Sequence, residues 1–274
     1  MTIKRSLAAL LLLAACTQPQ SPALAQPEAA NTIQRWRMPA ELREISGLAV
    51  SPDERLFAHD DERAIIYEIE PREGRLVKRF ALGQPLERGD FEGLAITPAG
   101  VFWMTTSQGQ LYRFSEADDG ATAAFERFDT GLRDVCEIEG LAYLAADDSL
   151  ILACKRNQAR DMRDWIALYQ WRPGAAQATL WRRFDAAELA SAAGVERFRP
   201  SSLDIAGDRM LLLSANRGAL AEYELDGERI SVRALGPEHP QAEGVVRLPD
   251  GAIVISDEGG DGQAQLSIYP RSGP

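Results

Sequence analysis

The chain has 274 residues, of which 45% are apolar and 26% are charged, a composition typical of a globular protein with one large core. Its formal net charge is −11, and an acidic surface repels polyanions. We therefore expect neither nucleic acid nor anionic lipid as a direct partner. Lysine occurs only as Lys4, Lys78 and Lys155, so arginine supplies nearly all the positive charge and the sequence shows no basic patch.

Residues 1–15 have the features of a signal peptide. Lys4 and Arg5 precede an apolar stretch, residues 7–15, that is too short to span a bilayer as a stable anchor. The stretch ends in Leu-Ala-Ala-Cys16, which resembles a bacterial lipobox. We therefore expect cleavage before Cys16. Because Lys4 and Arg5 are then removed together with no acidic residue, the mature chain has a net charge near −13.

Lipidation of Cys16 is expected to hold the protein in the bacterial cell envelope. Each acyl methylene buried in the bilayer contributes about 0.8 kcal/mol, and the lipid is the expected membrane contact. Thr17 follows Cys16 in place of the aspartate that usually retains lipoproteins at the inner membrane, so this resemblance favours the outer membrane and a domain facing the periplasm. The alternative is ordinary secretion, with cleavage after Ala25.

Residues 16–31 are rich in Gln, Pro, Ala and Ser and have no apolar periodicity, which predicts a flexible tether. The remaining residues, 32–274, are expected to form one domain. Within it a five-residue phrase recurs five times, at spacings of 46, 47, 62 and 42 residues. A period of roughly 40–50 residues is typical of propeller blades. The five copies begin at Glu44 (EISGL), Asp90 (DFEGL), Glu137 (EIEGL), Arg199 (RPSSL) and Gln241 (QAEGV).

Short strands separated by turn residues fill each repeat, which predicts an all-β, five-bladed β-propeller; the alternative is six blades, with one too diverged to recognise. The expected strands are residues 48–50, 55–58, 64–69 and 75–82; 94–97, 101–105, 110–114 and 123–128; 141–144, 150–154, 166–171 and 179–184; 203–206, 210–213, 220–225 and 230–235; and 245–248, 252–256 and 265–269.

The fifth repeat lacks a fourth strand before the chain ends. Residues 32–38 form a candidate strand that would complete this blade and close the ring, which protects the sheet edges. The pattern of residues 185–193 predicts a helix, an insertion that explains the long third interval. Leucines that follow the glycine position are expected in the core. Cys136 and Cys154 flank the two innermost strands of the third repeat, where a disulfide and two buried thiols are both compatible with the sequence.

Polar residues recur at two positions of the phrase. Since side chains on one face of a strand repeat every second residue, both positions are expected on the same face at one mouth of the central channel. The residues one before the glycine position are Ser46, Glu92, Glu139, Ser201 and Glu243. The residues three before it are Glu44, Asp90, Glu137, Arg199 and Gln241.

The ends of the second strands return to this mouth and add further candidate ligand-binding residues: Asp60, Asp61, Lys155, Asn216, Arg217, Asp257 and Glu258. Three converging glutamates repel one another unless raised pKa values, a cation or neighbouring Lys and Arg side chains offset the repulsion. Calcium suits such a ring because it takes 6–8 oxygen ligands in loose geometry. Calcium is therefore the candidate cofactor, and an ion-pair network without metal or an organic ligand alone are the alternatives. The predicted metal ligands are Glu92, Glu139 and Glu243.

These phrases resemble the SdiA-regulated family of bacterial envelope propellers, and the opening acid-x-Ser-Gly-Leu also resembles esterase-like phytase domains, more weakly. The resemblance implies a propeller with a candidate calcium site and no established activity. The chain departs from the family pattern in the fourth repeat, where Arg199 and Ser201 replace acids. The residues that carry it are EISGLA from Glu44, DDE from Asp60, IYEI from Ile66, DFEGLA from Asp90, EGLAY from Glu139, LACK from Leu152, PQAEGV from Pro240 and VISDE from Val254.

The expected function is the binding of a small molecule or an envelope protein at the channel mouth by a monomeric propeller. The alternative is a metal-dependent hydrolase (an esterase, lactonase or phosphoesterase) at the same mouth, with Glu92 or Glu139, Asn216 and Asp257 holding the metal. The sequence has no Gly-x-Ser-x-Gly elbow and no phosphate-binding glycine loop. His59 is either a general base or a hydrogen-bonded structural residue.

Overall fold

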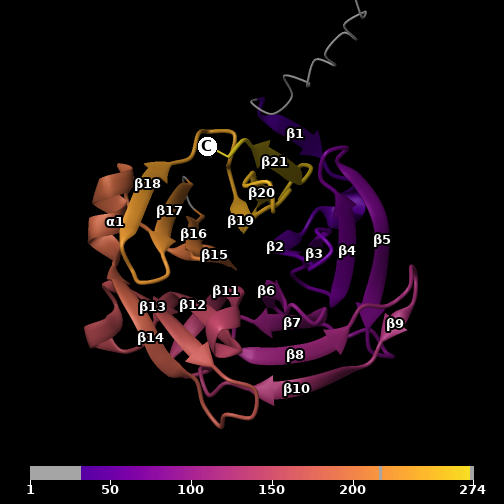
Figure 1. The fold of residues 1–274 in the computed structure, drawn as a ribbon, viewed down its shortest axis with the longest axis horizontal. Coiled ribbons are helices and arrows are strands. Elements are labelled where there is room, and N and C mark those ends of the chain that lie inside the picture. Colours follow the sequence, from indigo (N-terminus) through magenta and orange to yellow (C-terminus); the bar gives the residue numbers. More distant parts are fainter. Residues whose placement is uncertain (1–31, 216–217, 272–274) are drawn as a thin grey trace, which may run out of the picture.

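The computed structural model describes residues 32–215 and 218–271, which form five sheets arranged around a central axis. Figure 1 looks down this axis: strands β2, β6, β11, β15 and β19 lie nearest the centre, and the later strands of each sheet lie further out. The protein is therefore a five-bladed β-propeller, as the repeat spacing predicts, and the six-bladed alternative is wrong.

In blades 1 to 4 the strands lie in chain order from the axis outward, and in blade 5 strand β1 is added at the outer edge. Blade 1 contains β2 (Ile45–Val50), β3 (Leu56–Asp60), β4 (Ile65–Glu70) and β5 (Arg75–Leu82). Blade 2 contains β6 (Phe91–Ile96), β7 (Val101–Thr106), β8 (Gln110–Ser115) and β10 (Phe125–Asp129). Blade 3 contains β11 (Cys136–Leu144), β12 (Ser149–Asn157), β13 (Trp165–Trp171) and β14 (Thr179–Asp185). Blade 4 contains β15 (Pro200–Ala206), β16 (Arg209–Ser214), β17 (Ala219–Glu224) and β18 (Arg229–Ala234). Blade 5 contains β19 (Ala242–Arg247), β20 (Ile253–Asp257), β21 (Gln265–Tyr269) and β1 (Gln34–Arg37).

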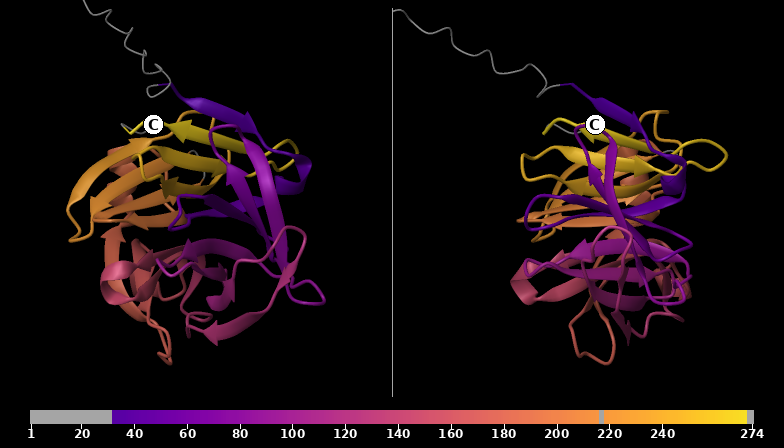
Figure 2. Two further views of the ribbon diagram at one scale, coloured as in Figure 1. Left: turned by 45° about the vertical axis from the view of Figure 1, so that its right-hand side comes forward. Right: turned by 90° about the vertical axis from the view of Figure 1, so that its right-hand side faces the viewer.

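Strand β1 closes the ring. It pairs antiparallel with β21, with Gln34 opposite Ile268 and Arg37 opposite Gln265. Figure 2 shows this contact from the side, where the indigo N-terminal strand lies along the yellow C-terminal strands. The sequence prediction that residues 32–38 complete the last blade is confirmed. Joining the two ends of the chain in one sheet ties blade 5 to blade 1 through the backbone.

The outer edge of blade 2 differs from the prediction. The segment expected as one strand, residues 123–128, is divided into β9 (Thr122–Ala123) and β10. Strand β9 pairs parallel with β5 and so belongs to the sheet of blade 1, whereas β10 pairs with β8. The prediction of a single strand here is wrong because the chain crosses between two blades within a few residues, and an apolar pattern does not reveal which sheet edge a strand joins.

Helix α1 (Ala186–Ala193) is the predicted insertion between β14 and β15. The side chain of Asp185 accepts hydrogen bonds from the backbone N–H groups of Ala187 and Glu188, both at 2.9 Å, and so caps the helix start. Three short 3-10 helices complete the described elements: η2 (Ala40–Leu42), η3 (Ala145–Asp147) and η4 (Arg160–Met162). Among the described residues, none of the helices has the length and apolar character needed to cross a bilayer.

The hydrophobic core is divided among the spaces between neighbouring blades. Each innermost strand contributes its residue after the glycine position to a different apolar cluster, and all five of these side chains are buried. These residues are Leu48, Leu94, Leu141, Leu203 and Val245. The recurring Gly-Leu of the sequence is therefore the packing unit of the blades, as the sequence predicts.

The glycine before each of these residues lets one innermost strand touch the next. A Cβ placed on Gly47 would stand 3.0 Å from the backbone nitrogen of Leu94, and one on Gly93 would stand 2.7 Å from that of Leu141. Gly140 and Gly244 make equally close backbone contacts with blades 4 and 1. Any side chain at these positions would push neighbouring blades apart.

A disulfide joins Cys136 to Cys154, with their Cα atoms 5.8 Å apart. The bond links β11 to its neighbour β12, and both residues are buried. Of the two alternatives that the sequence leaves open, the structure has the disulfide. Such bonds persist in oxidising compartments, so this bond is in keeping with a protein outside the cytoplasm without specifying which compartment.

We expect Gly93→Ala to lower the free energy of unfolding by roughly 1–3 kcal/mol, because the new methyl group overpacks a backbone contact that cannot relax without moving a blade. The matched control is Gly262→Ala, where a Cβ would meet only ordinary contact at 3.4 Å and the change should stay within about 0.5 kcal/mol. Urea unfolding measures both. Equal stabilities of the two variants would contradict the proposed role of the inner contact.

Candidate functional site

Every innermost strand carries a β-bulge at the residue before its glycine position. The pairing of β6 with β7 passes from Phe91 to Gly93 and leaves Glu92 without a partner. The same irregularity occurs in the other blades. The sequence does not predict these bulges, and a bulge changes the direction of a side chain. The residues at the five bulges are Ser46, Glu92, Glu139, Ser201 and Glu243.

The three bulge glutamates influence one another electrostatically. Burial raises the pKa of Glu92 to about 10, with the negative charges of Glu139, Asp90 and Glu243 adding to the effect. Burial also raises the pKa of Glu243 to about 8, with Glu139 as the next cause. The structure therefore gathers these carboxyl groups at one mouth of the channel, where burial favours the protonated forms of Glu92 and Glu243.

Lys155 is the cation of this inner group. Its Nζ atom lies 2.8 Å from Oε1 of Glu139 and 4.0 Å from Oε1 of Glu137. Burial raises the pKa of Glu139, Lys155 lowers it, and the balance is about 7. Arg156 forms a separate ion pair with Glu137 at 2.7 Å. One lysine thus offsets one buried carboxylate, while protonation neutralises the other two.

A second acidic group, Glu44, Asp61 and Glu258, lies beside the first. Among residues 32–215 and 218–271, these three acids bring one oxygen atom each within 4.8 Å of one another. Burial and then the contact with Glu44 raise the pKa of Glu258 to about 7, while the hydrogen bond from Glu258 lowers that of Glu44. The charge of Glu258 also raises the pKa of Glu243, so the two acidic groups influence each other electrostatically.

Asp61 is the exceptional member of this trio. Burial, together with the charges of Asp60, Glu44 and Glu62, raises its pKa to about 6. Its Oδ1 atom is buried and has no hydrogen-bond partner among the described residues. A buried carboxylate oxygen without a partner is costly. The trio therefore offers an unpaired, preformed acceptor to a positively charged or hydrogen-donating species.

Two acids expected at the mouth instead serve the fold. Asp60 is buried, accepts from the backbone N–H of Arg63 at 2.8 Å and pairs with the guanidinium of the same residue at 2.5 Å. Asp257 is also buried, and one of its oxygens lies 2.7 Å from Nδ1 of His239. Both carboxylates hold strand ends of their own blades, and neither is free for a ligand.

His59 is likewise committed to the backbone. Its Nε2 atom accepts from the N–H of Gly47 at 3.0 Å, and its Nδ1 atom lies 3.1 Å from the carbonyl oxygen of Asp60. Burial lowers its pKa to about 4, so the ring is neutral at physiological pH. A neutral ring with both nitrogens occupied is a structural residue rather than a general base.

The remaining predicted residues are placed as follows. Ser46 and Ser201 are buried at their bulges, and the Ser201 hydroxyl donates to the carbonyl oxygen of Ala242 at 2.8 Å. Arg199 is half-buried, and its backbone N–H donates to Ser214 Oγ at 2.9 Å. The predicted ligand residues Asn216 and Arg217 and the predicted lipidation residue Cys16 lie outside the described residues.

Comparison with known families identifies this propeller. The model of the SdiA-regulated family matches residues 22–260, which is most of the chain, and the protein therefore belongs to that family. The resemblance noted in the sequence is confirmed. Comparison with curated proteins gives no match.

Solved structures with the same fold are distant in sequence. The chain is 13% identical to the glutaminyl cyclase of Myxococcus xanthus, with a TM-score of 0.55 over 86% of this chain and 94% of that one. It is 13% identical to the PQQ-bound aldose sugar dehydrogenase of Streptomyces coelicolor, with a TM-score of 0.52 over 89% and 99%. It is 9% identical to the Cps50 (Swd1) β-propeller domain of Myceliophteria thermophila, with a TM-score of 0.50 over 87% and 99%. At these identities the likeness shows the fold alone.

The bulge glutamates make stability depend on pH. Because the pKa of Glu92 is higher in the folded chain, at about 10, than its ordinary value of 4.5, folding retains a proton that the unfolded chain releases. This contribution is complete below about pH 4.5 and is lost as the pH rises toward 10. We expect Glu92→Gln, which stays neutral, to be more stable than wild type by roughly 1–3 kcal/mol at pH 8–9 and similar to it near pH 5.

Urea unfolding with chelator at several pH values measures this difference. The matched control is Glu137→Gln, which removes an acid that is paired with Arg156 and should not gain stability at high pH. Parallel pH profiles for wild type and Glu92→Gln would show that Glu92 is not held in a desolvating, acidic environment.

Proposed function

We propose that this protein is a binding propeller of the bacterial cell envelope, held to the outer membrane by lipid on Cys16. Its acidic mouth binds a divalent cation, for which calcium is the best match, together with a small molecule or an envelope protein. The observation that carries the proposal is the buried, unpartnered Oδ1 of Asp61 beside Glu44 and Glu258. The fold and family are compatible with this role, and the trio supplies the chemistry.

The donor set suits calcium. Oxygen ligands surround calcium at about 2.3–2.6 Å, so two ligands on opposite sides of one ion lie up to roughly 5 Å apart. The carboxylate oxygens of Glu44, Asp61 and Glu258 lie within 4.8 Å of one another, which is compatible with a shared ion. Three carboxylates leave room in the coordination for oxygen atoms of a ligand. A bound ion would neutralise the trio and offer a positive centre to that ligand.

The inner glutamates, which the sequence predicts as metal ligands, have a role other than metal binding in this proposal. Glu139 already has Lys155 as its cation, and burial keeps Glu92 and Glu243 protonated. Such a group resembles the ion-pair network that the sequence left as an alternative. We therefore assign the cation to the trio and propose that Glu92 and Glu243, as neutral acids, donate hydrogen bonds to the bound ligand.

Binding is favoured over hydrolysis. The metal set considered for a hydrolase includes Asp257, which is buried against His239, and the candidate base His59 is neutral and bonded to the backbone. The carboxyls of Glu139 and Glu258, with pKa values of about 7, could serve as general bases, but Glu139 is paired with Lys155 and Glu258 is in contact with Glu44. The proposed function is therefore recognition.

Calcium titration by calorimetry at pH 7.5, after chelation, tests the cation site. We expect saturable binding to wild type, at least tenfold weaker binding to Asp61→Asn and Glu258→Gln, and unchanged binding to the control Glu137→Gln. Affinity should also fall between pH 7.5 and 5.5, because Asp61, with a pKa of about 6, and Glu258, with a pKa of about 7, become protonated.

Two outcomes of this titration would overturn the assignment. Absence of binding heat, with an unchanged thermal midpoint on calcium addition, would remove the cation from the proposal. Loss of binding in Glu92→Gln but not in Asp61→Asn would move the cation to the inner glutamates.

Metabolic labelling with a fatty-acid analogue tests the membrane anchor. We expect wild type to incorporate label and Cys16→Ser to lose it entirely, because the thiol is the acylated group. Thr17→Asp should keep the label and move the protein from the outer-membrane to the inner-membrane fraction. Equal labelling of wild type and Cys16→Ser would refute lipidation at this residue.

A further inference from the structure

A large cavity lies at the opposite mouth of the channel from the acidic groups. Its volume is about 940 Å³, and residues from the C-terminal ends of all five innermost strands line it. In strand β19, Glu243 lies at the acidic mouth and Arg247 lines this cavity. The two residues are four positions apart, which corresponds to about 13 Å along a strand. The two sites are distinct.

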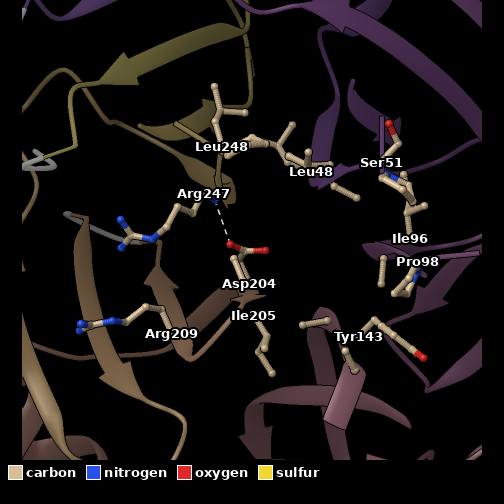
Figure 3. Close-up of a pocket in the computed structure, with 18 of the residues that line it drawn as sticks. Leu48, Ser51, Ile96, Pro98, Tyr143, Asp204, Ile205, Arg209, Arg247 and Leu248 are labelled. Carbon is tan, nitrogen blue, oxygen red and sulfur yellow. Dashed lines mark hydrogen bonds between the residues drawn. The ribbon is translucent and has the colours of Figure 1, made fainter. Parts of the chain in front are cut away.

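Apolar side chains form one part of the cavity wall, and charged side chains, among them Asp204 and Arg247, form another. Figure 3 shows Leu48, Ile96, Ile205 and Leu248 around an open centre, with Tyr143 at one side. Cavities of roughly 300–1,000 Å³ with apolar walls and a few polar groups are typical small-molecule sites. The size and lining therefore suit a small organic molecule rather than a bare ion.

Asp204 is the polar group at the centre of the cavity. Its Oδ2 atom accepts a hydrogen bond from the backbone N–H of Arg247 at 2.9 Å, and Figure 3 shows the other oxygen directed into the open space. Burial raises the pKa of this carboxyl to about 6, against the opposing effects of the Arg247 N–H group, the Arg247 charge and the Ile205 N–H group. Above about pH 6 this half-buried carboxyl therefore adds a negative charge to the cavity.

The positive charge of Arg247 acts on Asp204, but no cationic side chain of the described residues forms an ion pair with it. The guanidinium of Arg247 pairs with Glu222 at 2.7 Å, and that of Arg209 pairs with Glu224 at 3.0 Å. Both guanidinium groups point away from the centre in Figure 3. Among the residues that the structure describes, Asp204 takes part in no salt bridge, whereas the neighbouring acids do. A partly desolvated carboxylate without an ion pair is stabilised when a cationic ligand pairs with it.

We propose that this cavity binds a small organic cation that has a single primary ammonium group and an apolar body. The ammonium pairs with Asp204, and the body packs against the wall formed by Leu48, Ile96, Ile205 and Leu248. A carboxylate of the same size is disfavoured because it meets a like charge, and an alcohol because it leaves the charge unpaired. The proposal is independent of the cation site at the other mouth.

Ligand-observed NMR and calorimetry at pH 7.5 with three primary amines (hexylamine, phenethylamine and cyclohexylmethylamine) test the proposal. We expect at least one amine to bind wild type, and its matched alcohol and carboxylate to bind at least tenfold more weakly. Asp204→Asn should lose at least tenfold in amine affinity while it keeps an oxygen for the N–H of Arg247. Ile96→Arg, which places a positive charge in the cavity wall, should also abolish binding.

Asp61→Asn is the matched control, because it removes an acid from the other mouth and should leave amine binding unchanged. Failure of all three amines to bind at millimolar concentration would overturn the proposal, as would equal binding of amines and carboxylates. Loss of amine binding in Asp61→Asn but not in Asp204→Asn would show that the amines occupy the acidic mouth instead.

Discussion

Close contact between the five innermost strands is the constraint on which the rest of the structure depends. Where Gly47, Gly93, Gly140 and Gly244 stand, the backbone of a neighbouring blade lies within about 3 Å of the position of a Cβ, so only glycine fits without displacement. In blade 4 the position holds Ser202, whose Oγ instead accepts a hydrogen bond from the N–H of Val245 at 3.2 Å. The inner ring is therefore narrow, and the side chains beside it extend toward one mouth of the channel or the other.

This narrow ring gives the two mouths opposite character. At the N-terminal ends of the innermost strands, bulges turn glutamates into the mouth, where burial and mutual repulsion favour protonated carboxyls and Lys155 pairs with Glu139. At the C-terminal ends the strands surround a cavity in which apolar side chains lie beside the carboxylate of Asp204 and other charged groups. We assign, as proposals, a metal ion and a polar partner to the first mouth and an amphipathic small molecule to the second.

The sequence predicts the architecture well because each blade repeats one packing unit, and a repeated unit leaves a period that can be read directly. The five blades, strand β1 and helix α1 follow from that period and from local turn and cap signals. Strand β9 was missed because its partner lies in another blade. The bulges at Glu92 and its equivalents were missed because a bulge depends on pairing between strands. Burial of Asp257 against His239 also depends on contacts between distant residues.

Anomalous diffraction from a calcium-soaked crystal of the mature protein tests the central claim most directly, since it locates an ion relative to both acidic groups and shows whether the blades close as described. The account predicts one anomalous peak, within coordination distance of Glu44, Asp61 and Glu258, with Glu92, Glu139 and Glu243 gathered beside it around the axis. A mouth without a peak at saturating calcium, or bulge glutamates dispersed on the outer surface, would contradict it.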